Sequence, residues 1–461
     1  MKESDNAVLK IIKKRKRASK LTPARMIIFG FILLILAGAF LLFLPISSKS
    51  GNFTGFANAL FTATSSVCVT GLVVVDTNTY WSLFGQIVIL ALIQIGALGI
   101  MSVVTLFSVV TGRALGLNQR LALKESISNY SLENIFNVFK GILKVTLIIE
   151  GFGAAIISIV LIPAYGLIAG VGKSIFHSIS SFCNAGFDVF GTETESFKSL
   201  AGYNGNFLMI LTTAMLIIIG GLGFIVWNDL AKTKKLSRLT VHTKIVLVMT
   251  GILLITGTLI YFIFESANTM NGMPWYTKLL NAFFHSVSAR TAGFATLPIE
   301  KMDISSNLST IILMFIGAAP GSTAGGIKVT TVFVLAATVS SFLRGYNDVQ
   351  VFKKRIATEI IHKSISVFIL GIILVIATTG VLLANNEGSL LEALFETVSA
   401  FGTVGLSTGI TPNLSDVSKY QLVATMLLGR VGTITAFAVF TSMQGKNNLT
   451  YRCPEGKITV G

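Results

Sequence analysis

Long apolar runs recur along the chain and are separated by shorter polar segments. The run at 26–46 has about 20 residues without a charge, the length that a helix needs to cross a hydrocarbon core of about 30 Å. We therefore expect two sets of spanning helices. The first set lies at 26–46, 139–168, 243–265 and 361–385, and the second set lies at 82–111, 205–230, 307–343 and 419–443.

The loops between paired spans repeat one pattern four times. In each loop a phenylalanine precedes a glycine by ten residues, a serine lies five or six residues before that glycine, and a bulky apolar residue follows it. Such a segment is too short to cross a bilayer but long enough for a helix that enters and returns. The four pairs are Phe61 and Gly71, Phe176 and Gly186, Phe283 and Gly293, and Phe395 and Gly405.

The repeats predict an all-α integral membrane protein of four fused units, each made of a span, a re-entrant pore helix with its loop, and a second span. Four loops that enter from one face close into a ring. The expected fold thus has eight transmembrane helices and four re-entrant loops around a pseudo-fourfold pore. The repeats are expected at 26–111, 137–230, 240–345 and 357–444, between a basic cytoplasmic N-terminus at 1–25 and a cytoplasmic C-terminal tail at 445–461.

Charge is scarce and unevenly distributed. Only 12% of the residues are charged, 52% are hydrophobic, and the formal net charge is +16. The basic residues lie beside apolar spans, whereas the intervening connections are richer in Asp and Glu, which is the positive-inside pattern. This pattern predicts that both termini are cytoplasmic, favours contact with membrane lipid, and argues against a nucleic-acid partner. The basic clusters lie at 13–20, 232–244, 342–355 and after 444.

The four loops offer the ligands that a dehydrated cation requires. Backbone carbonyls replace the water of hydration, and glycine permits the backbone angles that turn carbonyls toward an axis. A pore helix that ends at each loop adds the negative end of its dipole. We expect the ion-binding selectivity filter to comprise Val69, Thr70, Gly71, Asn184, Ala185, Gly186, Thr291, Ala292, Gly293, Thr403, Val404 and Gly405.

The motifs "SSVCVTGL", "SFCNAGF", "SARTAGF" and "SAFGTVGL", together with the terminal "PEGKITVG", resemble those of the Trk, Ktr and plant high-affinity potassium transporter superfamily. The short segment before the first span favours the Ktr-type membrane subunit. The resemblance implies potassium uptake across the plasma membrane, with sodium as a candidate activator and no cofactor bound by this chain. It also implies a homodimer and a cytosolic ring of nucleotide-binding regulatory subunits.

The stretch 307–343 is too long for one span and is interrupted by "GAAPGSTAGGIK" at 317–328. Proline removes a hydrogen-bond donor and the glycines weaken the helix, so we expect two half-helices joined by an intramembrane loop. The resemblance implies that this loop is a gate. We expect Arg430 to bind the loop backbone and hold it closed. The gate residues are Gly317, Ala318, Ala319, Pro320, Gly321, Ser322, Thr323, Ala324, Gly325, Gly326, Lys328 and Arg430.

Other charged residues lie close to the loops or within the spans. Arg290 would oppose a cation if it faced the axis, so we expect it to point behind the filter, where it donates to loop carbonyls or pairs with Glu396. The alternative is an arginine extended to water. For Glu150 and Glu265 we expect hydrogen bonds to loop backbone. Both arginine interpretations keep the charge away from the ion path.

Glycines also recur in the second spans, at Gly96, Gly220, Gly317 and Gly429. Small residues at such positions allow helices in a membrane to pack closely. The same glycines also allow unusual backbone angles beside the ion path, and the sequence leaves both interpretations open.

Two other classes of protein fit parts of the sequence. A secondary transporter of a small organic solute would use broken helices, but it predicts two inverted halves rather than four direct repeats. A membrane enzyme would need a reactive constellation, and Cys68, Cys183 and Cys453 have no metal-ligand spacing. A phosphate-binding loop is excluded because Ile327 separates the glycine from Lys328.

Overall fold

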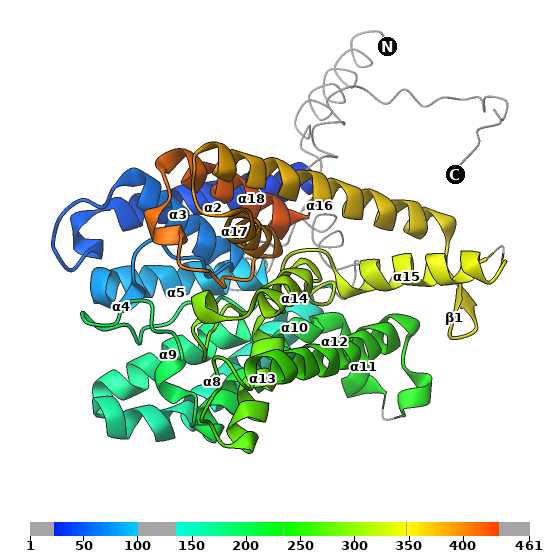
Figure 1. Cartoon of the computed structure of the whole chain (residues 1–461), viewed down its shortest axis with the longest axis horizontal. Coiled ribbons are helices and arrows are strands. Elements are labelled where there is room, and N and C mark those ends of the chain that lie inside the picture. Colours follow the sequence, from blue (N-terminus) through cyan, green and yellow to red (C-terminus); the bar gives the residue numbers. More distant parts are fainter. Residues whose placement is uncertain (1–22, 100–134, 234, 347, 433–461) are drawn as a thin grey trace, which may run out of the picture.

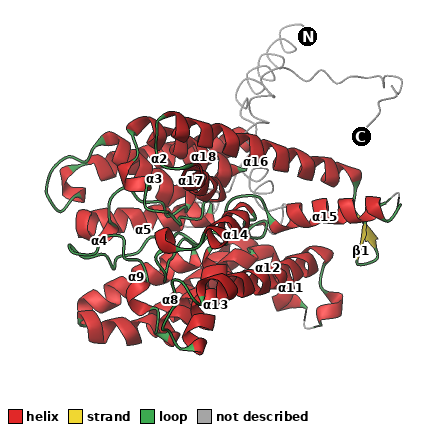
Figure 2. Cartoon of the chain, viewed as in Figure 1, coloured by secondary structure: helices red, strands yellow, loops and turns green. Residues whose placement is uncertain are grey.

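The computed structural model describes residues 23–99, 135–233, 235–346 and 348–432. Residues 1–22, residues 100–111 of the first predicted repeat, and the chain after residue 432 lie outside the described residues. Within the described ranges nearly every element is a helix (Figure 2). The sheet found there is a short antiparallel hairpin of β1 (Gln350–Val351) and β2 (Lys354–Arg355).

The first set of predicted spans forms long helices. They are α2 (Pro23–Phe43), α8 (Ile135–Tyr165), α12 (Val241–Glu265) and α16 (Thr358–Ala384). In the described part of the chain these 4 helices are long and apolar enough to cross a membrane. Their outer faces expose large apolar side chains such as Leu33, Ile148 and Ile263, as expected of helices that contact lipid.

A shorter helix, whose C-terminal part is buried, follows each long one. These re-entrant helices are α3 (Phe56–Cys68), α9 (Leu167–Phe182), α13 (Trp275–Ser288) and α17 (Leu390–Gly402). With 13 to 16 residues they are too short to cross a bilayer. In α17 a capping box between Ser389 and Glu392 satisfies backbone donors at the helix start. Each long helix is therefore followed by a helix too short to span, and the re-entry of these short helices into the membrane stays a prediction.

In the described residues, each helix of the second set ends before the predicted end of its span. α5 (Leu83–Leu98) ends at Gly99 with φ 80°, α10 (Phe207–Leu222) at Gly223 with φ 89°, and α18 (Asp416–Val431) at Gly432 with φ 91°. A left-handed residue cannot continue a right-handed helix, so each glycine ends the helix that precedes it.

The interruptions alter one predicted span and confirm the break expected in another. The span expected over 205–230 is broken, because α11 (Phe224–Lys232) leaves α10 at an angle of 91°. The expectation of two half-helices in 307–343 is confirmed by α14 (Ile304–Phe315) and α15 (Val329–Leu343). Counting the bent pair α10 and α11 as one span brings the clear spans in the described residues to 5. The full set of eight spans stays a prediction.

Several short elements complete the described chain. They are η1 (Pro45–Ser47), α4 (Thr77–Tyr80), η2 (Ala201–Tyr203), η3 (Leu236–Arg238), η4 (Ile299–Lys301) and η5 (Thr411–Asn413). Figure 1 shows β1 at the far end of α15, well away from the re-entrant helices.

The helices pack in a closed circular order. Within a repeat, each re-entrant helix packs on its long helix, as α9 does on α8 and α13 on α12. Between repeats, the second helix of one repeat contacts the re-entrant helix of the next. These contacts join α5 to α9, α10 to α13, α14 to α17, and finally α18 back to α3. The last contact closes the ring and brings the four loops that follow the re-entrant helices to a common centre.

Candidate ion pathway

The four loops after the re-entrant helices share one backbone conformation. In each loop the glycine of the repeated pattern has a positive φ, and so does the residue two positions before it. A positive φ in a non-glycine residue is costly and persists only where its surroundings hold it. The paired angles are 59° and 90° at Val69 and Gly71, 59° and 69° at Asn184 and Gly186, 75° and 78° at Thr291 and Gly293, and 51° and 95° at Thr403 and Gly405.

Each of these glycines lies against the carbonyl oxygen of the next loop. An added Cβ would lie 2.5 Å from the Ala185 oxygen at Gly71 and 2.8 Å from the Ala292 oxygen at Gly186. The corresponding distances are 2.3 Å to the Val404 oxygen at Gly293 and 2.4 Å to the Thr70 oxygen at Gly405. The loops therefore meet in cyclic order, and four carbonyl-bearing residues surround one centre.

Hydrogen bonds to the pore-helix serines hold the loops in place. The amide of Thr70 donates to the Ser65 carbonyl at 2.7 Å, that of Ala185 to Ser180 at 2.7 Å, and that of Val404 to Ser399 at 2.9 Å. The third loop differs by one residue, because its serine, Ser288, lies five rather than six positions before the glycine. These bonds leave the loop carbonyls free to face the centre, where the helix C-termini add a negative potential.

The recurrent glycines of the second helices pack against the ends of the re-entrant helices. A Cβ added to Gly96, Gly220 or Gly429 would lie 1.9 to 2.0 Å from the carbonyl oxygen of Val67, Phe182 or Phe401, respectively. Each of those carbonyls lies four residues before a filter glycine. The close-packing interpretation therefore holds for these three. Gly317 differs, because it approaches the Gly325 oxygen within the gate loop.

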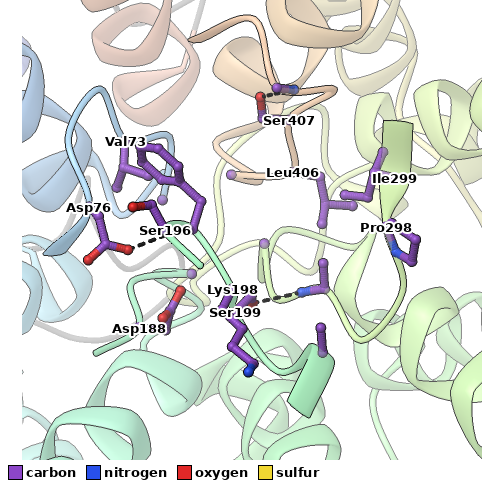
Figure 3. Close-up of a pocket in the computed structure, with 18 of the residues that line it drawn as sticks. Val73, Asp76, Asp188, Ser196, Lys198, Ser199, Pro298, Ile299, Leu406 and Ser407 are labelled. Atoms are coloured by element: carbon purple, nitrogen blue, oxygen red, sulfur yellow. Dashed lines mark hydrogen bonds between the residues drawn. The ribbon is translucent and has the colours of Figure 1, made fainter. Parts of the chain in front are cut away.

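A cavity of about 940 Å³ opens on one side of the ring. All four filter glycines line it, as do the carboxyl-bearing residues Asp76, Asp188, Glu195 and Glu300 and the amine of Lys198. Figure 3 shows Asp76 and Asp188 on one side of this cavity and Pro298 and Ile299 on the other. Excess negative charge in a concave site raises the local concentration of cations.

None of the four acidic residues of this cavity was identified from the sequence as a site residue. Asp76 caps α4 by accepting from the amides of Asn78 and Thr79, and it also accepts from the amide of Phe197 at 2.9 Å. Burial raises the pKa of the Asp188 carboxyl to about 6, and the nearby charge of Asp76 adds to that effect. The signal that could have identified Asp188 is its position two residues after Gly186 in an acidic connection.

On the helix-terminus side of the ring, the gate loop at 317–328 packs against two other repeats. The amide of Ala319 donates to the Gly221 carbonyl at 3.1 Å, and the amide of Phe224 donates to the Gly321 carbonyl at 3.0 Å. A Cβ added to Gly325 would lie 2.3 Å from the Thr403 hydroxyl oxygen. The loop therefore lies directly against the fourth filter loop.

Two cationic side chains bind the carbonyls of the gate loop. Arg430 donates to the Thr323 carbonyl, and its Nη2 also donates to the Gly96 carbonyl at 2.7 Å. The Lys328 amine donates to the carbonyls of Ala324 at 2.6 Å and Gly325 at 3.2 Å. The expected contact between Arg430 and the loop backbone is present, and the gating role of that contact stays a prediction.

The predicted pairing of Arg290 with Glu396 is wrong. The Glu396 carboxylate is buried and accepts from Ser407, from the Thr408 amide at 2.9 Å and from Thr411 at 2.7 Å. Arg290 instead donates to the Thr250 hydroxyl at 3.4 Å. The alternative of an arginine extended to water also fails, because Arg290 is only 6% exposed.

The other two acids of the spans differ from each other. Glu265 accepts from the amide of Asp303 at 2.9 Å, as expected of a residue that supports loop backbone. Glu150 does not, because its carboxyl accepts from the side chain of Gln94 at 3.1 and 3.2 Å. Across the described ranges, no group of three or more His, Cys, Asp and Glu residues is arranged to hold a metal ion.

Residues 13–450 match the TrkH family of cation transport proteins. The chain is 37% identical over 456 residues to the potassium/sodium uptake protein NtpJ of Enterococcus hirae, which covers 98% of this chain and 100% of that relative. It is 36% identical to the Ktr system potassium uptake protein B of Bacillus subtilis, over 96% of this chain and 97% of the relative.

The fold is also similar to that of a solved transporter. The crystal structure of the potassium transporter TrkH from Vibrio parahaemolyticus matches with a TM-score of 0.67, over 91% of this chain and 84% of that one. At 18% sequence identity this likeness concerns the fold alone. The family match over nearly the whole chain confirms the resemblance found in the filter motifs. The chain belongs to the TrkH family of cation transport proteins and is a membrane transporter of cations.

Proposed function

We propose that this protein takes up potassium across the plasma membrane through a filter made of the four converging loops. The observation that carries the proposal is the cyclic approach of the carbonyls of Thr70, Ala185, Ala292 and Val404 to the glycines of neighbouring loops. Carbonyl oxygens in a ring replace the hydration shell of a monovalent cation. Relatives named for potassium uptake support potassium as the ion.

The proposed architecture has four repeats at 26–111, 137–230, 240–345 and 357–444, with eight spans and cytoplasmic N- and C-termini. The circular contact order of the helices supports a pore at the pseudo-fourfold axis. In this orientation the acidic cavity opens to the outside and collects cations. The membrane potential then drives entry with about 2.3 kcal/mol per charge per 100 mV.

The loop at 317–328 is proposed as the gate. It lies against the fourth filter loop, and Arg430 and Lys328 occupy its carbonyls. A buried cation on a cation path is an electrostatic barrier, so these two side chains oppose conduction while they remain there. Movement of the loop, with Lys328 at its end, away from Arg430 of α18 would open the path.

We further propose that the chain works as a homodimer with a cytosolic ring of nucleotide-binding regulatory subunits, and that sodium is a candidate activator. Three curated relatives are named as proteins of a Ktr system, and one relative is named for both potassium and sodium uptake. The basic segments at 232–244 and 342–355 are the proposed cytoplasmic contacts of such a ring.

Uptake into proteoliposomes tests the proposal. We expect rubidium and potassium to accumulate in response to an inside-negative potential, sodium to accumulate poorly, and a panel of neutral organic solutes not to accumulate. Each of Gly71→Ser, Gly186→Ser, Gly293→Ser and Gly405→Ser should reduce the preference for rubidium over sodium. Equal uptake of both ions by the wild type, or four variants with unchanged preference, would overturn the filter assignment.

A further inference from the structure

Glu150 is a buried carboxyl residue that joins three elements behind the second filter loop. It lies in α8 and is 4% exposed. Its carboxyl accepts two bonds from Gln94 of α5. The single thiol proton of Cys183 faces both Glu150 Oε1, 3.7 Å from Sγ, and Gln94 Oε1, 3.6 Å from Sγ. Cys183 follows α9 directly and precedes Asn184, the residue whose positive φ begins the second filter loop.

The third repeat has leucine at the equivalent position. In the second repeat the Ser178 hydroxyl donates to the Glu150 carbonyl at 2.7 Å, and in the third the Ser286 hydroxyl donates to the Leu254 carbonyl at 3.0 Å. Three residues after Glu150, Gly153 lies against Ser178, and three residues after Leu254, Gly257 lies against Ser286. The backbone contact is therefore the same, and this position of the fold accepts an apolar side chain.

A carboxyl at this position carries a cost that leucine would avoid. Burial of a carboxylate away from water is unfavourable, and replacement of a buried charged group by an apolar one is often neutral or stabilising. Among the described residues, Glu150 has no basic side chain within ion-pair distance. Stability of the scaffold does not explain the carboxyl, whereas its link to Cys183 connects it to the filter.

The first filter loop provides a contrast. Cys68 lies three residues before Gly71, as Cys183 lies three residues before Gly186. Both thiols are fully buried. Only Cys183 has a carboxyl partner among the hydrogen bonds of the described residues. The two loops therefore share a thiol position, but one of them is held by an additional polar network.

We propose that Glu150 is a positioning residue that sets the geometry of the second filter loop through Gln94 and Cys183, and thereby the preference for potassium over sodium. This inference rests on the proposed filter function. The carboxyl anchors the turn from α9 into Asn184, and Gln94 ties that anchor to the first repeat. Loss of the anchor lets the Ala185 carbonyl depart from the distance that a dehydrated potassium ion requires.

The test compares Glu150→Leu, which installs the residue of the third repeat, with Glu150→Gln, which keeps an acceptor for Gln94 and Cys183. We expect Glu150→Leu to unfold at the wild-type temperature or above it. Its KM for rubidium should rise about tenfold, the change expected from the loss of one hydrogen bond to a charged group. Its KM for sodium should change little. Glu150→Gln should restore the ratio of the two KM values to within about twofold of wild type.

A matched pair of thiol variants and one filter variant complete the design. Cys183→Ala should reproduce the KM change of Glu150→Leu, and Cys68→Ala should not. An unchanged KM ratio in Glu150→Leu, or a change that coincides with lower thermal stability, would overturn the inference. Gly186→Ser in the same assay separates the inference about Glu150 from the filter assignment. If Gly186→Ser alters the KM ratio while Glu150→Leu does not, only the inference about Glu150 fails. If neither variant alters the ratio, the filter itself is wrong.

Discussion

At the scale of single residues, the filter glycines meet two requirements at once. Gly71, Gly186, Gly293 and Gly405 all have positive φ, and each leaves no room for a Cβ beside the neighbouring carbonyl. Any side chain would add backbone strain of about 1 to 3 kcal/mol and would push against backbone rather than against a movable side chain. The requirement for glycine is therefore steric and conformational, and it is the same in all four loops.

Alanine substitutions at the four glycines should differ in severity. An added Cβ has the most space at Gly186, 2.8 Å, and the least at Gly293, 2.3 Å. We expect Gly293→Ala to lower the rubidium-to-sodium uptake ratio about tenfold and Gly186→Ala to lower it less. Gly251→Ala in α12 is the control, because nothing lies within 4 Å of its added Cβ. The prediction fails if Gly251→Ala affects the ratio as much as Gly293→Ala.

The outer cavity should respond to external pH through Asp188. Its raised pKa of about 6 means that the carboxyl is charged at neutral pH and becomes protonated as the external pH falls through that value. Protonation removes a negative charge near the filter, so the KM for potassium should rise as the external pH falls from about 8 to about 5. In Asp188→Asn the KM should already be high at neutral pH and should vary less with pH. A wild type and variant with the same pH profile would contradict this role.

At the scale of elements, the helices and breaks of the repeats could be predicted where local sequence decides the structure. The spacing of phenylalanine, serine and glycine predicted the re-entrant helices, and proline with several glycines predicted the break after α14. The break after α10 was not predicted, because Gly223 within an apolar run is equally compatible with close helix packing. Only the positive φ at Gly223, which depends on packing against the gate loop, distinguishes the two.

Partners of buried charges depend on the whole fold and could not be read from spacing. Glu396 lies in α17, the re-entrant helix of the fourth repeat. Because the third and fourth repeats are neighbours in the sequence, Arg290 of the third loop was the expected partner. The hydroxyls of Ser407 and Thr411 follow it closely along its own chain segment and occupy its oxygens instead. Gln94 as the partner of Glu150 likewise joins two repeats, and no local pattern indicates it.

The gate loop should limit flux through its two cations. Arg430→Ala removes the donor to the Thr323, Gly96 and Ala97 carbonyls and the charge beside the path. We expect the variant to raise the rate of rubidium uptake several-fold, and deletion of residues 318–326 to do the same. Flux measurements in proteoliposomes at equal protein content check this. If both changes leave the flux at the wild-type level, the loop is not the gate.

At the scale of the whole molecule, closure of the ring depends on contacts between repeats. The pairs α5 with α9, α10 with α13, α14 with α17, and α18 with α3 use the same surfaces in turn. A side chain from the fourth repeat, Lys419, donates to Asn58 of the first at 3.0 Å. Four similar units in one polypeptide can form a ring like that of a symmetric tetramer. Each unit can also differ from the others, as the third does in the loop at 317–328.

The orientation of the whole molecule can be tested with a native cysteine. Cys68 and Cys183 are fully buried, so a membrane-impermeant maleimide should label the folded protein only at Cys453 in the predicted cytoplasmic tail. We expect labelling in inverted membrane vesicles and not in intact cells, and Cys453→Ser should abolish it. Labelling of intact cells at Cys453 would reverse the orientation and would turn the acidic cavity toward the cytoplasm.

Location of the transported ion is the most direct test of the central claim. Crystals of the detergent-solubilised protein grown with rubidium in place of potassium should give an anomalous difference peak on the pseudo-fourfold axis. We expect this peak about 3 Å from the carbonyl oxygens of Thr70, Ala185, Ala292 and Val404. Peaks confined to separate pockets, or an empty axis at a rubidium concentration that saturates uptake, would contradict a filter built from the four loops.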